Sequence, residues 1–182
     1  MPLPYRLVRS SRKTVSLEVK PDGSILVRAP RRLSERAIRE FVISKEPWLL
    51  EKLRKIESRP VLPPLTEAEL HALKQQAQAD LTARVRHFAP LAGVTYGRIT
   101  VRAQKTRWGS CSQAGNLNFN CLLMLAPPEI RDYIVIHELC HRKHMNHAPA
   151  FWAAVEVLCP DYRQRRAWLK DNGGGLIARL PD

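Results

Sequence analysis

A largely apolar segment that carries two histidines and a glutamate constrains this chain more than any other feature. Residues 134–141 read IVIHELCH, which is the pattern of a buried helix that includes His137, Glu138 and His141. Four residues advance an α-helix by about 400°, so the two histidines lie on one face, one turn apart. Two imidazoles at this spacing can bind one zinc ion, and Glu138 can reach a water on the open side of the metal. We therefore predict a zinc site on this helix.

A third ligand is expected beyond the helix. The spacing of His137, His141 and His147 is that of the extended zinc signature H-E-x-x-H-x-x-G-x-x-H, with His144 in place of the glycine. Glu156 is the alternative third ligand, because some zinc sites combine two histidines with a glutamate. His144 is interpreted either as a residue that lines the site or as an exposed one.

The position of His147 requires the helix to end before it. In a continuous helix His147 would lie about 15 Å along the axis from His137, too far to share a metal. We expect Asn146 to adopt the left-handed conformation at this break and Pro149 to begin the next helix.

Charge and cysteine content bound the class of protein. The 182 residues include 30 Lys and Arg against 17 Asp and Glu, a net charge of +13, which suggests nucleic acid, a nucleotide or an acidic protein as partner. A general basic bias without a specific partner is the alternative reading.

The four cysteines form no C-x-x-C pair and are interpreted as reduced thiols of a soluble, cytoplasmic protein. No segment has the length and apolar character of a signal peptide or membrane span.

Residues 1–58 are predicted to form an N-terminal region of strands and a kinked helix. Three short β-rich segments, 5–8, 14–19 and 24–29, predict an antiparallel meander. Ser34 is positioned to cap the following helix, which Pro47 should kink or restart. Residues 59–65 are a Pro-rich linker, residues 66–175 the metal-binding domain, and residues 176–182 a loose tail.

The second region is predicted to combine helices with a small antiparallel sheet. A capping box, Thr66 to Glu69, begins a helix that should end near His87. Strands are expected at 98–102, 106–111 and 116–120, the last two as a hairpin. The metal helix should begin at residues 127–129, and Asp161 should cap a last helix over 162–170.

An exposed strand edge beside the metal helix could hold an extended peptide by main-chain hydrogen bonds. The residues that we expect to contact substrate lie mainly on these strands. They are Trp108, Gly109, Ser110, Asn118, Asn120 and His144.

Five closely spaced segments resemble the YgjP-like metallopeptidase family, which is related to the SprT-like zinc proteases. The segments are RWGSC at 107–111, NLNFN at 116–120, HELCH at 137–141, NHAPAFW at 146–152 and DYR at 161–163. The resemblance implies an α+β fold with a compact, gluzincin-like zincin domain. It also implies that His137, His141 and His147 hold zinc and that Glu138 is the catalytic acid and base.

The leading hypothesis is a zinc-dependent metallopeptidase that hydrolyses peptide bonds in a protein or peptide substrate through a zinc-activated water, with Glu138 as general base and acid. A nucleotide phosphohydrolase, such as a nucleoside triphosphate pyrophosphatase, is the first alternative, because the same machinery can attack phosphorus. A nucleic-acid-associated protein with a structural zinc is the second. Tyr133, His144 and Tyr162 are candidates for stabilising an oxyanion.

Overall fold

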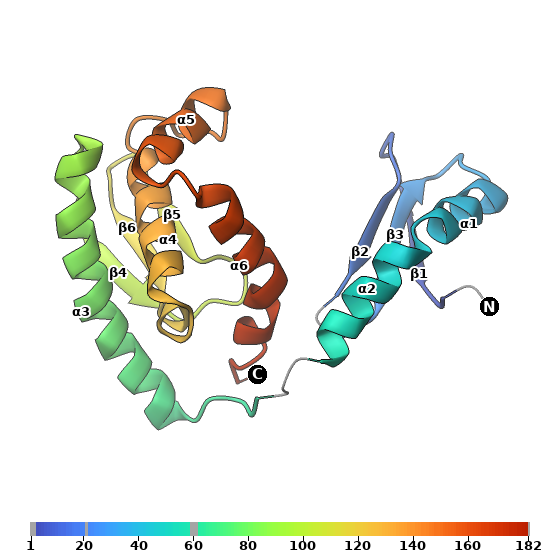
Figure 1. Cartoon of the computed structure of the whole chain (residues 1–182), viewed down its shortest axis with the longest axis horizontal. Helices are drawn as coiled ribbons and strands as arrows, with labels where there is room; N and C mark the ends of the chain where they lie inside the picture. Colours follow the sequence, from blue (N-terminus) through green and yellow to red (C-terminus); the bar gives the residue numbers. More distant parts are fainter. Residues whose placement is uncertain (1–2, 21, 59–61, 182) are drawn as a thin grey trace. The chain divides into compact units, whose positions relative to one another are not determined.

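The computed structural model describes residues 3–20, 22–58 and 62–181 of the chain. The chain divides into two units, residues 1–62 and 63–182, and the second contains the predicted metal helix. Both combine helices with a three-stranded sheet, so the predicted α+β class is confirmed (Figure 1). Residues 59–61 of the predicted linker lie outside the described residues.

The first unit contains a mixed sheet and two helices. Its strands are β1 (Arg6–Ser10), β2 (Ser16–Val19) and β3 (Ile25–Pro30). The predicted meander is wrong, because β1 pairs with β3 in parallel and only β2 pairs with it antiparallel. The apolar β3 is the most buried of the three and takes the central place in the order β1-β3-β2.

Two helices follow the sheet of the first unit. They are α1 (Glu35–Ser44) and α2 (Glu46–Glu57). As predicted, the Ser34 side chain caps α1 by accepting a hydrogen bond from the Ala37 N–H, and Pro47 lies in the first turn of α2. Ile38, Val42 and Leu49 of these helices share a small core with β3.

The second unit is built around α4 (Pro128–Cys140), the helix that carries His137 and Glu138. α3 (Glu67–Ala92) packs along one side of α4, α6 (Tyr162–Ile177) along the other, and α5 (Pro149–Leu158) at one end (Figure 1). The residues of α4 are buried except near its first turn and at His137. The predicted metal helix is thus the central element of its unit.

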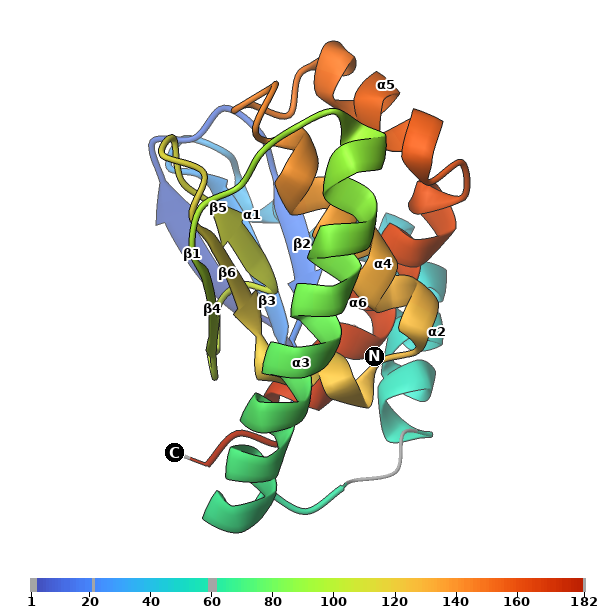
Figure 2. The same cartoon turned by 90° about the vertical axis from the view of Figure 1, so that its left-hand side faces the viewer.

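The sheet of the second unit also differs from the prediction. Strands β4 (Ile99–Arg102), β5 (Gly109–Cys111) and β6 (Leu117–Asn120) lie in the order β4-β6-β5, beside α3 and α4 (Figure 2). The predicted hairpin is present, since β5 and β6 are antiparallel, but β4 pairs with β6 in parallel. A 3₁₀-helix, η1 (Cys121–Leu125), connects β6 towards α4.

Two helices run further than predicted. α3 continues through Pro90 to Ala92 and ends at Gly93, whose φ of 61° is left-handed. A proline in the last turn removes only one hydrogen bond, and the buried residues Ala77, Leu81, Val85 and Ala89 hold α3 against the core.

No helix in the described part of the chain has both the length and the apolar character needed to cross a membrane.

α6 extends through three glycines to Ile177 instead of stopping at residue 170. Gly173 is buried against the Trp108 indole, and a Cβ atom there would lie 2.9 Å from the ring. The predicted loose tail is also wrong for residues 176–181: Leu180 is buried, and the Arg179 carbonyl accepts a hydrogen bond from the Leu65 N–H. Packing therefore orders a segment whose composition suggested a chain end without structure.

Candidate metal centre

The break after α4 brings His147 back to the other two histidines. α4 ends at Cys140, and a turn follows in which the N–H of His144 donates to the Cys140 carbonyl. The break is as predicted, but Asn146 is not left-handed, because no non-glycine residue in the described ranges has a positive φ. Instead its side-chain oxygen accepts a hydrogen bond from the Ala148 N–H, just before α5 begins at Pro149.

The arginine that follows His141 fixes this turn to the sheet side of the unit. The Arg142 guanidinium donates to the carbonyls of Thr95 and Gln113. It lies 2.8 Å from where a Cβ atom of Gly115 would stand, and Gly115 has a φ of 83°. Glycine is therefore required at residue 115 both for its conformation and for this close approach.

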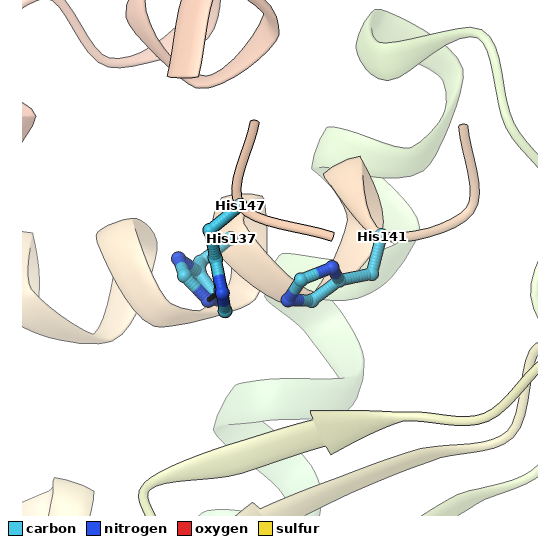
Figure 3. Close-up of side chains that lie close together, drawn as sticks. All are labelled: His137, His141 and His147. Atoms are coloured by element: carbon cyan, nitrogen blue, oxygen red, sulfur yellow. Dashed lines mark hydrogen bonds between the residues drawn. The ribbon is translucent and has the colours of Figure 1, made fainter. Parts of the chain in front are cut away.

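The three imidazoles converge on one point. Their ligand nitrogens lie within 4.8 Å of one another, and Figure 3 shows the three side chains reaching towards one another. His137 Nε2 and His147 Nε2 are 3.1 Å apart. Two nitrogens bound to one tetrahedral zinc would lie about 3.3 Å apart, given bond lengths of about 2.0–2.1 Å. The donor set and its spacing therefore fit a zinc ion.

Hydrogen bonding selects the ligand atom of His141. Its Nδ1 lies 3.0 Å from the His144 carbonyl oxygen, which can only accept. The Nδ1 atom must therefore carry the proton, and the lone pair is left on Nε2. His144 thus contributes through its main chain, whereas its imidazole does not belong to the convergent group.

Glu156, the alternative third ligand, is engaged elsewhere. Its carboxylate accepts a hydrogen bond from Arg163 Nη1 at 2.6 Å. Among the described residues, the group able to hold a metal consists of His137, His141 and His147. The geometry favours His147 as the third ligand.

Aromatic rings form the support of the three histidines, a role that the sequence reading missed. The Phe151 ring lies 4.8, 4.5 and 4.8 Å from the centroids of His137, His141 and His147. Trp152 stacks on His147 at 5.6 Å. Both residues follow His147 by about one helical turn.

Burial shifts the protonation of the site strongly. It lowers the pKa of His137 to about 3, an effect to which His141 and His147 add, and it also lowers the pKa of His141. Burial raises the pKa of Glu138 to about 8, with Arg107 acting in the opposite direction. His137 and His141 are therefore neutral at neutral pH, which is the form that binds metal.

The carboxylate of Glu138 lies against β5. A Cβ atom at Gly109 would stand 2.6 Å from Glu138 Oε1 and 2.8 Å from its Cγ. Any other residue at position 109 would displace the carboxylate. Gly109 is therefore the residue that allows Glu138 to lie beside the strand.

An open groove extends from the metal centre between α4 and α6, and we call it the α4–α6 groove. Trp108 and Gly109 line it on the β5 side. Tyr133, Ile134, His137 and Glu138 line it from α4, and Arg166, Leu169 and Lys170 line it from α6. Of the three proposed oxyanion donors, Tyr133 lies in this groove.

The other predicted substrate contacts lie outside the groove lining. Ser110 and Asn118 face each other across β5 and β6, with Asn118 Nδ2 3.4 Å from Ser110 Oγ. Asn120 is buried, and its amide donates to the carbonyls of Gln104 and Arg107. Asn120 therefore holds the loop that precedes β5.

We expect alanine at position 109 to separate catalysis from metal binding. The added methyl group would push Glu138 out of place without touching the three histidines, and a misplacement of about 1 Å can lower kcat roughly 100-fold. Gly175→Ala is the matched control, because nothing lies within 4 Å of its added Cβ. Metal content and kcat measured for both variants test this expectation, and unchanged turnover in Gly109→Ala would contradict it.

The pKa of Glu138 predicts how the stability of the metal-free protein depends on pH. Between pH 6 and 8 the unfolded chain has already released this proton, whereas the folded protein holds it until about pH 8. A raised folded-state pKa gives stability that is lost as the pH rises, here by about 2 kcal/mol over this range. His137 and His141 act in the opposite direction at the acid end of this range, because burial lowers their folded-state pKa values, to about 3 for His137.

Urea unfolding in EDTA at pH 6 and pH 8 measures this effect. We expect the wild type to lose stability over the interval relative to Glu138→Gln, in which only the opposing contribution of the histidines remains. Equal slopes in the two proteins would show that Glu138 is not the titrating group.

A buried helix with two histidines and a glutamate, joined by a third histidine after a break, defines the class of the zincin-type metal-dependent hydrolases. The family described as YgjP-like, metallopeptidase domain, matches residues 13–72 and 66–172. The chain belongs to this YgjP-like metallopeptidase family, as its motifs indicated.

Two solved structures are similar to about half of this chain. Abylysin from Pyrococcus abyssi, solved as a metallopeptidase zymogen, is 23% identical and has a TM-score of 0.45, with 50% of this chain and 93% of that chain covered. The jannalysin zymogen from Methanocaldococcus jannaschii is 20% identical and has a TM-score of 0.41, with coverages of 48% and 93%. No curated protein matches the chain.

Proposed function

We propose that the chain is a zinc-dependent peptidase in which His137, His141 and His147 hold the metal and Glu138 is the general base and acid. The observation that carries this proposal is the convergence of three imidazoles on one point beside a buried carboxylate. Membership of a metallopeptidase family supports a peptide or protein substrate, and it gives no support to the nucleic-acid partner suggested by the charge.

Each side chain has a defined task in this mechanism. A zinc ion held by the three Nε2 atoms would polarise the scissile carbonyl and lower the pKa of a bound water. Glu138 accepts the proton of the attacking water and later donates it to the leaving amine. Its burial raises the pKa towards neutrality, the range in which a group both accepts and donates protons efficiently.

The free edge of β5 offers a way to position the peptide. β5 is the last strand in the order β4-β6-β5, so one side of it has no partner strand within the sheet. An extended peptide paired with that edge would pass Gly109 and the adjacent carboxylate of Glu138. Main-chain hydrogen bonds would then hold the scissile bond near the metal.

Hydrolysis assays with purified, zinc-loaded protein test the proposed function. We expect new amino groups to form on incubation with casein, and no phosphate or pyrophosphate to be released from nucleoside triphosphates. Release of phosphate without cleavage of casein would favour the phosphohydrolase instead.

A further inference from the structure

We propose that Arg166 and Lys170 form a subsite for a carboxylate group of the substrate. The preferred substrates would be peptides with an acidic side chain, or a free C-terminal carboxylate, within a few residues of the scissile bond. This inference rests on the proposed peptidase function and adds the substrate class to it.

The two cations lie on the same wall of the α4–α6 groove. Both belong to α6 and both line the groove that contains His137 and Glu138. They are four residues apart, so they share one face of the helix with a rise of about 6 Å between them. A carboxylate with its two oxygens can be contacted by both side chains at once.

The other two arginines of α6 differ from Arg166 and Lys170, because each is paired with a carboxylate. Arg163 is paired with Glu156 at 2.6 Å, and Arg165 is paired with Asp161 at 2.9 Å. In the described ranges 3–20, 22–58 and 62–181, neither Arg166 nor Lys170 forms an ion pair with a carboxylate. The charges of Arg163 and Arg165 are thus neutralised by carboxylates, whereas the positive charges of Arg166 and Lys170 remain at the groove.

Glu138 does not neutralise these cations. It is the sole acidic residue among those that line the groove, and the cation that acts on its pKa is Arg107. The charge of Arg166 instead lowers the pKa values of His137 and Tyr133. The guanidinium therefore lies at the metal end of the groove. An incoming carboxylate would be the counter-ion that this wall lacks.

A cation–π contact holds Arg166 next to the metal ligands. Its guanidinium lies 4.8 Å from the centroid of the Trp152 ring, and that ring stacks on His147. Within the described residues the N–H groups of Arg166 donate to no protein acceptor, so a carboxylate can accept two parallel hydrogen bonds from them. One aromatic ring therefore separates the proposed subsite from the metal centre.

Internally quenched eight-residue peptides measure this preference. One position at a time is fixed as Glu, Gln or Lys around a common cleavage site, and a second pair of peptides differs only in a free or amidated C-terminus. We expect kcat/KM to be about tenfold higher for Glu than for Gln at one position, or for the free C-terminus over the amide, and to depend on ionic strength. The two arms distinguish a side-chain carboxylate from a terminal one.

Substitutions on α6 test whether Arg166 and Lys170 cause the preference for a carboxylate. Arg166→Gln combined with Lys170→Gln should bring the ratio close to one, and Arg166→Glu should shift it towards the Lys peptide. Arg163→Gln removes one charge from the same helix outside the groove, so it should retain the wild-type ratio. An unchanged ratio in the double variant, or no preference in the wild type, would overturn the proposal.

A binding assay separates this inference from the proposed activity. Zinc-loaded Glu138→Gln is titrated with the labelled Glu and Gln peptides, with circular dichroism as a check on folding. Tighter binding of the Glu peptide, lost in the added double substitution, supports the subsite even if no peptide is cleaved, an outcome in which only the proposed function fails. The same titration is made with the free and the amidated C-terminal peptides, and equal binding within both pairs refutes the subsite.

Discussion

Replacing Glu138 with glutamine is expected to lower kcat for peptide hydrolysis roughly 10²- to 10⁴-fold while the zinc content stays unchanged. Glutamine has nearly the same shape as glutamate, so it can occupy the buried space against Gly109. It cannot accept a proton, however, and the proposed mechanism has no other base beside the metal. The three histidines are untouched, and metal binding should therefore persist.

The comparison requires a matched glutamate on the same helix. Glu129 is exposed in the first turn of α4, and Glu129→Gln should retain both zinc and activity. Initial rates on casein and metal analysis of the three proteins give the result. Substantial hydrolysis by zinc-loaded Glu138→Gln would remove this carboxylate from the mechanism and leave the metal site without a defined base.

The metal site was the most predictable part of the molecule, because its chemistry depends on short-range geometry. The spacing of His137 and His141 follows from the helical repeat alone, and the distance to His147 requires a break. The conformation of the break was not predictable in the same way. A left-handed Asn146 and an Asx-type hydrogen bond to Ala148 both end a helix before Pro149, and the sequence does not distinguish them.

Strand direction was not predictable from the sequence. Alternation shows which face of β1 or β4 is apolar, but a parallel and an antiparallel partner bury that face equally well. The parallel pairing of β1 with β3 is set by the whole path of the chain. The same limit applies to α6, which runs past its predicted end at residue 170. The fit of Gly173 against Trp108 keeps the helix intact through three consecutive glycines.

The groove cations show a further limit of sequence reading. Arg163, Arg165, Arg166 and Lys170 form one basic stretch in the sequence and look equivalent. Two of them pair with Glu156 and Asp161, and two face the groove. Only the position of α6 against α4 separates them, and that position depends on packing across the whole unit.

Substitution of His147 by alanine is expected to weaken zinc binding at least about 100-fold, since it removes one of three protein ligands. At a zinc concentration 100 times the wild-type Kd, the wild type would gain about 2.7 kcal/mol of stability from the metal, and the variant would gain only about 0.4 kcal/mol. His147 is exposed, so its loss should leave the fold intact. Metal analysis after dialysis and thermal unfolding with and without zinc measure both effects.

Glu156→Ala is the decisive companion variant, because Glu156 is the other residue whose chemistry suits the third position. Its carboxylate pairs with Arg163, so its removal should cost an exposed ion pair and leave the zinc content unchanged. Loss of zinc from Glu156→Ala but not from His147→Ala would reverse the assignment. X-ray absorption at the zinc edge then distinguishes a catalytic from a structural zinc site. A hydrolase needs one coordination position open to water. Four protein ligands would close the site and exclude the proposed chemistry.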